Sequence, residues 1–450
     1  MSYTLSPQDT ICAQISAVGH AAVTLIRISG SSAIEIVAGF FSPAVKLRKS
    51  PSHRLLHGMF HDAEGKALDE VLLSVFKAPH SYTGEDSVEI SCHGNPNIAN
   101  RIMQNLLLHA RIAKPGEFTL RAYLNGKLDL SRAEAVNDLI NAKASKSETA
   151  ALMQLQGKLS EHLQDFLDRI AAARLRCELS IDFADQGLPS VDLAELQQSI
   201  SSLVEDTRLL AHRGEQGKHI REGISLCLAG APNAGKSSLF NAFLQQNRAI
   251  VTSHPGTTRD YLEESISLHG FPLLIYDTAG LRSSTDEVES AGISKSYELM
   301  QSSDLVLHLI DATNPADVVS LPQELLPKTI TVFSKADLLP PGHKRQAGAI
   351  YCSVMQANGI DELSQSILSR LMLDEDILAQ PIITNTRHIA AVNKCHQALL
   401  QAEQALADGL GYEFIAFDLI SASAALEEIL GVVTTDEMLE SIFSNFCIGK

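Results

Sequence analysis

Residues 230–237, GAPNAGKS, constrain the fold of this chain more than any other stretch, because they match the pattern G-x-x-x-x-G-K-[ST]. An apolar run, 224–230, precedes them, and the amphipathic stretch SSLFNAFLQQ follows. Glycines in such a loop let backbone N–H groups close around phosphates at the start of a helix. The sequence therefore predicts a strand, a phosphate-binding loop and a helix, and not merely a glycine-rich turn.

Further motifs follow in the order expected of a GTP-binding domain. Lys236 would reach the β- and γ-phosphates, and Ser237, Thr258 and Asp277 would supply oxygen ligands around Mg²⁺. The Gly280 amide would meet the γ-phosphate. In residues 334–337, SKAD, the last carboxylate would accept two hydrogen bonds from the guanine N1–H and 2-amino groups, which adenine cannot offer.

The expected catalytic glutamine is missing. Leu281 stands next to the glycine where Ras-like GTPases carry the Gln that orients the attacking water. Acidic candidates for this task follow at Asp286, Glu287 and Glu289. No arginine finger is evident, and a monovalent cation held by the Asn233 side-chain carbonyl would supply the missing charge.

The apolar pattern predicts a multidomain α/β and α fold. Residues 1–120 read as mixed α/β, with SVEISCHG at 87–94 alternating as a strand that has Glu89 on its polar face. Short apolar runs across 221–378 suit parallel strands buried on both faces, as in a Ras-like P-loop domain. A stripe from Leu152 to Ile181 predicts one long amphipathic helix. Helical patterns over 121–220 and 379–450 favour a helical bundle domain with the G domain inserted in it, and three consecutive domains are the alternative.

Composition limits the kinds of partner, cysteine chemistry and compartment that we expect for the protein. A net charge of −17 argues against a chain that coats nucleic acid non-specifically, without excluding a local basic patch. Seven scattered cysteines without a C-x-x-C pair indicate neither a disulfide framework nor a metal site. We find no apolar run of membrane-spanning length and no signal peptide, and we expect a cytoplasmic protein with no membrane part.

Other segments of the chain are shared by far fewer proteins than the phosphate-loop motif is. SYTGEDSVEISCHGNP at 81–96, KPGEFTLRAYLNGKLDLSRAEAVNDLI at 114–140 and the terminal FCIGK stand beside GAPNAGKSSLFNAF, IVTSHPGTTRD and YDTAGLR. With these marks the chain resembles, over essentially its whole length, the MnmE (TrmE) family of tRNA-modifying GTPases. The resemblance implies an N-terminal domain that dimerises and binds tetrahydrofolate, and a GTPase activated by K⁺ and by G-domain dimerisation.

The resemblance also implies partners and chemistry. A homodimer would form a heterotetramer with an MnmG-type FAD protein and install a (carboxymethyl)aminomethyl-type group at C5 of the wobble uridine of certain tRNAs. The one-carbon donor would be 5,10-methylenetetrahydrofolate, for which 5-formyltetrahydrofolate is an analogue.

Matching motifs carry the family's site residues onto this chain. The K⁺ ligands would be Asn233, Thr252, His254 and Thr257, the Mg²⁺ ligands Ser237 and Thr258, the water-positioning residue Glu289, and the folate residues Arg27, Glu89, Lys127 and Lys450. The residues expected around GTP are Asn233, Ala234, Gly235, Lys236, Ser237, Ser238, Thr252, Ser253, His254, Pro255, Gly256, Thr257, Thr258, Asp277, Thr278, Ala279, Gly280, Ser334, Lys335, Ala336, Asp337, Ser353 and Val354.

Two departures from the family pattern concern the guanine pocket. Ser334 replaces the usual Asn, and we expect it to lose one hydrogen bond, about 1 kcal/mol, and to weaken nucleotide binding. Val354 replaces the usual alanine after Ser353. Neither change concerns the phosphates, so GTPase activity is expected to survive.

The terminal Cys447-Ile448-Gly449-Lys450 superficially resembles a prenylation signal, but Gly449 and Lys450 do not suit one. We expect Cys447 to be a catalytic residue needed for tRNA modification but not for GTP hydrolysis. Two other functions stay open: an Era-like ribosome-assembly GTPase, which would need an appended basic RNA-binding module, and a non-hydrolysing switch with a vestigial G domain, which Leu281 and Ser334 favour mildly.

Overall fold

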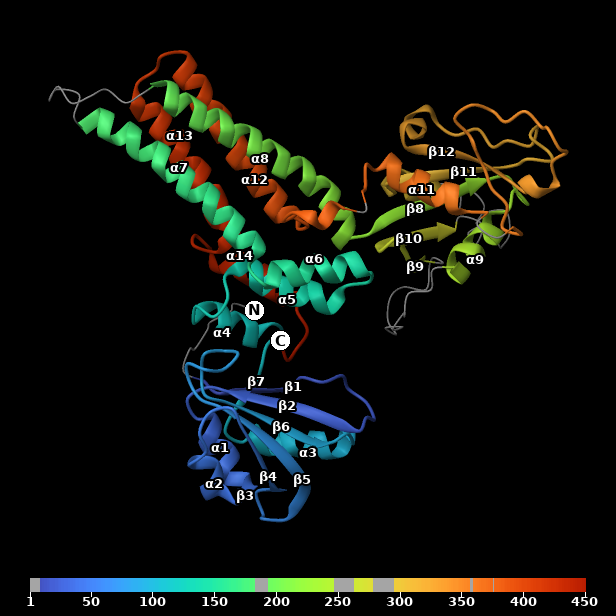
Figure 1. Cartoon of the computed structure of the whole chain (residues 1–450). Coiled ribbons are helices and arrows are strands. Elements are labelled where there is room, and N and C mark those ends of the chain that lie inside the picture. The colour runs from blue at the N-terminus through green and yellow to red at the C-terminus, as the bar shows by residue number, and fades with distance from the viewer. Residues whose placement is uncertain (1–8, 183–192, 247–262, 278–294, 357–358, 375) are drawn as a thin grey trace. The chain divides into compact units, whose positions relative to one another are not determined.

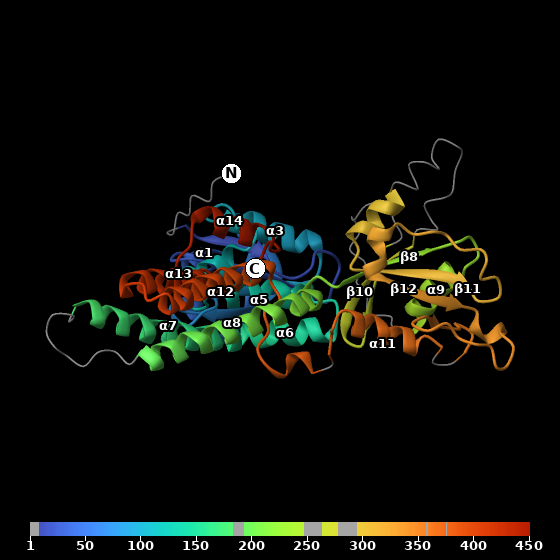
Figure 2. The same cartoon turned by 90° about the horizontal axis from the view of Figure 1, so that it is seen from above.

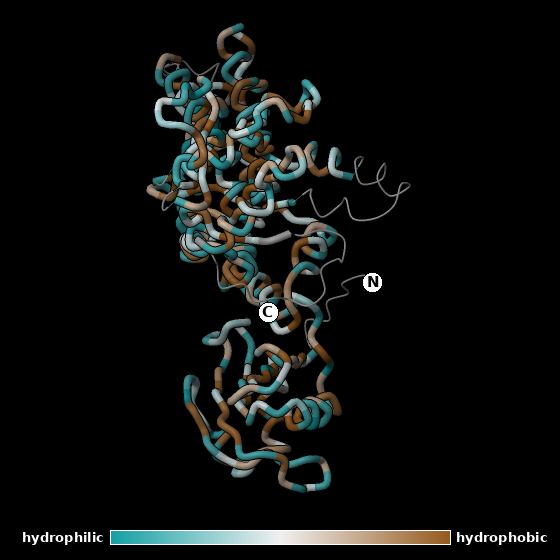
Figure 3. Tube along the Cα trace, turned by 90° about the vertical axis from the view of Figure 1, so that its right-hand side faces the viewer, coloured by the Kyte–Doolittle hydropathy of each residue, from teal (hydrophilic) through white to brown (hydrophobic). Residues whose placement is uncertain are grey.

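The computed structural model describes residues 9–182, 193–246, 263–277, 295–356, 359–374 and 376–450 of the chain (Figures 1 and 2). Contacts divide the chain into two compact units, Met1–Asn137 with Glu427–Lys450, and Asp138–Leu426. The first unit therefore takes residues 121–137 and 427–450 in addition to the N-terminal segment of the sequence-based division. In Figure 3, hydrophobic and hydrophilic residues alternate along the helices, as expected of elements that bury one face.

The first unit is built on a seven-stranded sheet of order β3-β4-β5-β6-β2-β1-β7, antiparallel except for the β1–β7 pair. Its strands are β1 Ile11–Gln14, β2 Val23–Ser29, β3 Phe41–Ser42, β4 Arg54–His61, β5 Ala67–Phe76, β6 Ser87–His93 and β7 Arg111–Ile112. Its helices are α1 Ala33–Phe40, α2 Ala44–Arg48, α3 Pro96–Leu106, α4 Glu117–Leu124, α5 Leu130–Asn141, which continues past the boundary, and α14 Asp436–Ser444.

The predicted alternation along β6 is confirmed. Val88 and Ile90 are fully buried and Cys92 is 3% exposed, in one core with α1 and α3, whereas Glu89 is partly exposed on the other face. A second cluster packs α14 and Phe446, two residues beyond its end, on α4 and α5, and its buried residues are Leu120, Leu130, Ala133, Leu439, Phe443 and Phe446. The helix before the C-terminal tail therefore packs within the first unit.

The second unit contains a six-stranded sheet of order β13-β12-β11-β8-β10-β9. Its strands are β8 Ile224–Gly230, β9 Glu263–Leu268, β10 Phe271–Asp277, β11 Leu305–Asp311, β12 Thr329–Ser334 and β13 Ile350–Tyr351. All pairs are parallel, as predicted, except the β9–β10 hairpin. The all-apolar runs are buried because the sheet is covered on both faces.

Helices α6 Ser145–Leu155, α7 Lys158–Asp182 and α8 Leu193–Arg221 precede this sheet, and α12 Thr386–Ala407 and α13 Tyr412–Leu430 follow it. Along the chain, further helices stand between the strands of this sheet or follow the last strand. They are α9 Lys236–Gln246, α11 Asp361–Arg370 and the short η2 Gln323–Lys328, η3 Ala336–Leu338 and η4 Ile377–Ala379. Helices α8 and α12 pack together although the sheet separates them in sequence. This packing is what an inserted G domain requires.

The prediction of one continuous helix from Leu152 to Ile181 is wrong. Gly157 adopts φ 88°, and the chain turns there between α6 and α7. Leu152 is 43% exposed, whereas Leu163 and Ile170, on the same predicted stripe, are fully buried. The apolar periodicity continues through the turn, so only the backbone conformation of the glycine reveals the break.

Candidate functional site

The phosphate-binding loop joins the carboxyl end of β8 to the start of α9, in the middle of the second sheet. Its backbone is left-handed at Asn233 (φ 63°) and Gly235 (φ 89°). A Cβ at Gly230 would lie 2.4 Å from the carbonyl oxygen of Leu309 on the neighbouring strand. A side chain at Gly230 would therefore force β11 away from β8.

The Lys236 ammonium lies against this loop. Its Nζ donates to the carbonyl oxygens of Gly230 and Ala231, each at 2.8 Å, and the residue is 8% exposed. The cation is thus at the N-terminus of α9, where unpaired N–H groups and the helix dipole also attract anions. This arrangement suits the β- and γ-phosphates of a nucleotide.

Two of the predicted magnesium residues lie together. Ser237 Oγ donates to Asp277 Oδ2 at 3.3 Å, because β10, which ends at Asp277, is the parallel neighbour of β8. A hydroxyl and a carboxylate are the oxygen ligands that Mg²⁺ prefers. The residues present therefore fit this ion beside the phosphates.

Ser334 links the base motif to the phosphate loop. Its buried Oγ donates to the carbonyl oxygen of Ala234 at 2.7 Å and lies 3.3 Å from that of Ile310. The serine thus makes a hydrogen bond from the end of β12 to the loop itself. The hydrogen bond that Ser334 is expected to lose because it replaces the usual Asn is a different one from this link to the phosphate loop.

The two predicted base-binding segments also meet. Asp337 Oδ1 accepts a hydrogen bond from Ser353 Oγ at 2.6 Å, and the Ala336 amide donates to the Cys352 carbonyl at 3.1 Å. The carboxylate that would read guanine is therefore oriented by the neighbouring segment. Val354, 37% exposed, follows directly.

Several predicted residues lie outside the described part of the chain, and their roles stay predictions. They are Thr252, Ser253, His254, Pro255, Gly256, Thr257, Thr258, Thr278, Ala279, Gly280, Leu281, Asp286, Glu287 and Glu289. Of the predicted K⁺ ligands, the structure describes Asn233, which is exposed in the phosphate loop.

In the first unit, Arg27 on β2 pairs with Glu89 on β6. Arg27 Nε and Nη2 donate to Glu89 Oε1 at 2.9 and 2.7 Å. The guanidinium carbon lies 5.1 Å from the ring centre of Tyr82 and 5.4 Å from that of Phe118. Burial raises the pKa of Tyr82, whose hydroxyl hydrogen-bonds Thr119 Oγ1 at 2.8 Å, so the phenol stays neutral. A charged pair beside two rings suits a flat heterocycle that carries amino and ring N–H groups.

The C-terminal tail binds the start of α4 through its backbone. The Gly116 amide donates to the Cys447 carbonyl at 3.4 Å and the Phe118 amide to the Lys450 oxygen at 3.1 Å. An antiparallel bridge joins Pro115 to Ile448. Lys450 is thereby brought next to Phe118, whose ring faces Arg27, while Lys127 Nζ donates to the Pro79 carbonyl at 3.0 Å.

Cys447 differs from the other six cysteines. It is exposed, whereas Cys12, Cys92, Cys177, Cys227, Cys352 and Cys395 are buried. Burial raises the pKa of Cys12, Cys227 and Cys395 to about 12 and that of Cys92, Cys177 and Cys352 to about 11. Cys447 is therefore the cysteine of this chain whose thiol is accessible to solvent.

A buried ionic network at α4 was not predicted from the sequence. Glu117 is fully buried and accepts hydrogen bonds from Arg111 at 2.5 and 2.8 Å, from Arg121 at 3.1 Å and from the Lys114 amide at 2.8 Å. Arg121 also binds Glu85 at 3.0 Å. Burial raises the Glu117 pKa, but these hydrogen bonds outweigh it and the net shift is downward. Charged residues at three- and four-residue steps in 111–121 were the available signal, but such a pattern is equally typical of a solvent-exposed helix face.

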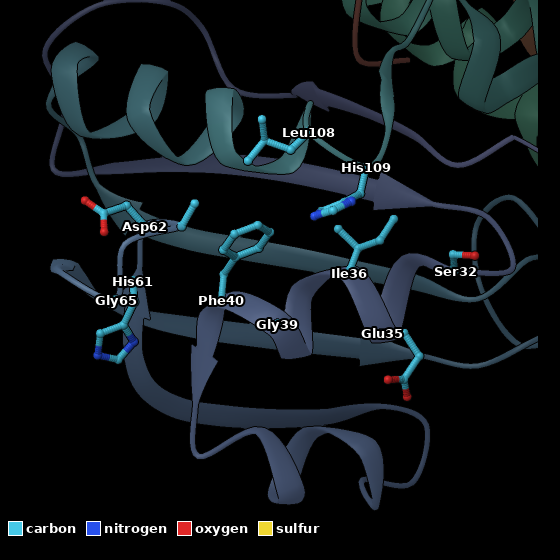
Figure 4. A pocket seen from close by; sticks show the side chains of 11 residues that line it. Ser32, Glu35, Ile36, Gly39, Phe40, His61, Asp62, Gly65, Leu108 and His109 are labelled. Atoms are coloured by element: carbon cyan, nitrogen blue, oxygen red, sulfur yellow. The ribbon is translucent and has the colours of Figure 1, made fainter.

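A cavity of about 760 Å³ lies elsewhere in the first unit (Figure 4). It opens between α1, the β4–β5 turn and the end of α3, with Phe40, Ile36 and Leu108 beside His61 and His109. The described residues that line it include none of the predicted site residues.

No described helix has the length and apolar composition to cross a membrane.

Comparison with known proteins identifies the family of this chain. A model of the MnmE helical domain matches residues 130–447, and one of the GTP-binding protein TrmE N-terminus matches residues 10–127. The chain is 41% identical to the tRNA modification GTPase MnmE of Moorella thermoacetica, over 98% of this chain and 99% of that protein. The chain belongs to the MnmE (TrmE) family. The corresponding Aquifex aeolicus protein is 37% identical over 98% of this chain and 100% of its own length.

Among solved structures, the G domain of the T. maritima FeoB iron transporter is similar with 25% identity and a TM-score of 0.24, covering 33% of this chain and 98% of that one. Because this score is low, the assignment to the MnmE family depends on the family models and the full-length relatives. The TrmE N-terminus model matches residues 10–127, which lie outside the G domain, and the range of the helical-domain model, 130–447, spans the G domain and continues to the C-terminal helices.

Proposed function

We propose that this chain is a K⁺-activated, dimerisation-dependent GTP hydrolase that modifies tRNA. With an FAD-containing MnmG-type partner, in a heterotetramer, it installs a (carboxymethyl)aminomethyl-type group at C5 of the wobble uridine. Membership of the MnmE family and the order of the nucleotide motifs support this function.

One observation carries the proposal beyond a generic GTPase. The tail with Cys447 and Lys450 binds the start of α4, and Phe118 there faces the Arg27–Glu89 pair. A phosphate-loop switch needs neither feature. Glu89 would hold tetrahydrofolate through its pterin amino and ring N–H groups, and the bound cofactor would supply the one-carbon unit.

Hydrolysis uses the residues at the ends of β8, β10 and β12. Lys236 neutralises charge on the transferred phosphoryl group, and Asp337 selects guanine. Ser237 and Asp277 would hold Mg²⁺, which would offset the negative charge of the phosphates. Glu289 would position the water that Leu281 cannot bind, and K⁺ at Asn233 would take the place of an arginine finger.

Two experiments test the proposal. GTP hydrolysis by the full chain should be faster in KCl than in NaCl at equal ionic strength, and equal rates would refute the role of K⁺. Cells lacking the protein should lack the C5 group on wobble uridine, and the wild-type gene should restore it. An unchanged nucleoside profile would refute the tRNA function and leave a GTPase switch.

A further inference from the structure

At the edge of the base pocket, Asp311 binds the side chain of Lys335, the second residue of the base motif. Lys335 Nζ donates to Asp311 Oδ2 at 2.5 Å. Asp311 ends β11, and in the parallel β11–β12 ladder it lies opposite Ser334. The pair therefore joins two strands at their carboxyl ends, where nucleotides bind on parallel sheets.

The Asp311 carboxylate is itself held in place. Its Oδ1 accepts hydrogen bonds from the Thr313 amide at 2.9 Å and from Thr313 Oγ1 at 2.7 Å, and the side chain is 17% exposed. Burial raises the Asp311 pKa, but the hydrogen bonds from Lys335 and Thr313 bring it down to about 2. The carboxylate is therefore a fixed acceptor that is charged at neutral pH.

Among the described contacts, the ion pair with Asp311 is the one that involves the Lys335 ammonium. Lys335 adopts a left-handed φ of 56°, and its side chain is 37% exposed. Other residues of the motif are held by hydrogen bonds: Ser334 binds the phosphate loop, and Asp337 binds Ser353. The long stem of Lys335 would sample many rotamers unless its ammonium were bound.

We propose that Asp311 is a positioning residue of the guanine site: by binding the Lys335 ammonium, it orders the aliphatic stem of this lysine as one face of the base pocket. The inference rests on the guanine-nucleotide binding proposed above. Ordering the stem before the nucleotide arrives reduces the conformational entropy lost on binding. Asp311 therefore affects affinity for the nucleoside part, whereas Asp337 decides which base is bound.

The test compares two ligands on the full-length protein. Asp311→Asn should weaken binding of fluorescent mant-GDP about fivefold, the size expected for a partly exposed ion pair. Binding of inorganic pyrophosphate, measured by calorimetry, should not change, because the phosphate loop is untouched. In hydrolysis assays KM should rise while kcat stays constant. Asp317→Asn, an exposed carboxylate in the loop after β11, is the matched control and should change nothing.

A double-mutant cycle tests whether Asp311 acts through the lysine. Lys335→Met keeps the stem but removes the ammonium and should also weaken mant-GDP binding about fivefold. Asp311→Asn should then add nothing in the Lys335→Met background. If Asp311→Asn does not fold, Lys335→Met alone carries the test, and an unchanged affinity for mant-GDP overturns the proposal.

Three further results would overturn the inference. They are an unchanged affinity of folded Asp311→Asn for mant-GDP, an equal loss of pyrophosphate binding, and a full effect of Asp311→Asn in the Lys335→Met background. A wild-type protein that binds no mant-GDP would instead refute the proposed function itself.

Discussion

The backbone oxygen of Lys450 accepts a hydrogen bond from the amide of Phe118 at 3.1 Å, at the N-terminus of α4. The ring of the same Phe118 lies 5.4 Å from the guanidinium carbon of Arg27. One residue thus connects the end of the chain to the pair proposed to bind folate. The position of the tail, and not only its presence, is therefore expected to matter for tRNA modification.

Gly449→Ala should displace the tail. Gly449 has φ 100°, and a Cβ there would lie 2.8 Å from the Gln14 carbonyl oxygen and 3.1 Å from the Ile15 Cα. Because misplacement of a reacting group by about 1 Å can cost a factor of about 100, modification should fall by that order while GTP hydrolysis continues. Nucleoside analysis of tRNA and a phosphate-release assay measure the two activities. Gly39→Ala, with nothing within 4 Å of the new Cβ, is the control.

Cys447→Ser should abolish wobble-uridine modification and leave GTP hydrolysis largely unchanged, because the hydroxyl is a far weaker nucleophile and the G domain is not touched. Iodoacetamide should label the native wild-type protein once, at Cys447, since the other six thiols are buried. Peptide mass spectrometry locates the label. Persistent modification in the serine variant would mean that the tail is only structural.

Asp337→Asn should change base preference. In the proposed pocket the carboxylate would accept two hydrogen bonds from guanine, and hydrogen bonds to charged groups contribute about 1.5–3 kcal/mol each. GTP affinity should fall at least about tenfold and XTP affinity should rise. Equilibrium titration with both nucleotides measures this. An unchanged preference for GTP would show that the pocket is assigned wrongly.

Ser334→Ala should weaken nucleotide binding about fivefold, the equivalent of one hydrogen bond of about 1 kcal/mol. The alanine removes the bond of Ser334 Oγ to the Ala234 carbonyl and leaves a buried oxygen without that donor. Titration with mant-GDP is the measurement. Ser369→Ala, on the exposed face of α11, should have no effect. An equal affinity of Ser334→Ala and the wild type would contradict the proposed link between the base motif and the phosphate loop.

Glu117→Gln should destabilise the first unit by about 3 kcal/mol at neutral pH, because Arg121, which is 4% exposed, loses a charged partner. The folded-state pKa of Glu117 lies below its ordinary 4.5, so its stabilising contribution is present above that value. The contribution is lost as the pH falls through the folded-state pKa. Urea titrations should therefore show the two proteins converging under acid conditions, and a gap independent of pH would contradict the role of the carboxylate.

Much of the nucleotide site was predictable from sequence because its geometry is local. A glycine-rich loop between an apolar strand and a helix specifies its own conformation, so Lys236 and Ser237 lie where the motif indicates. Apolar runs likewise indicated the parallel strands. The antiparallel β9–β10 hairpin was not predicted, and neither was the turn at Gly157, where the apolar periodicity continues through a change of backbone conformation.

The sequence by itself determined the motifs, their order and the family to which the chain belongs. Only the tertiary structure decided that the Ser334 hydroxyl reaches the phosphate loop, that Glu117 is buried among arginines and that the tail binds α4. The serine and tail contacts join residues far apart in sequence, whereas the Glu117 partners are close in sequence and only their burial is decided by the fold. The energies of these contacts depend on burial and on distances between strands or helices, which the chain acquires only when it folds.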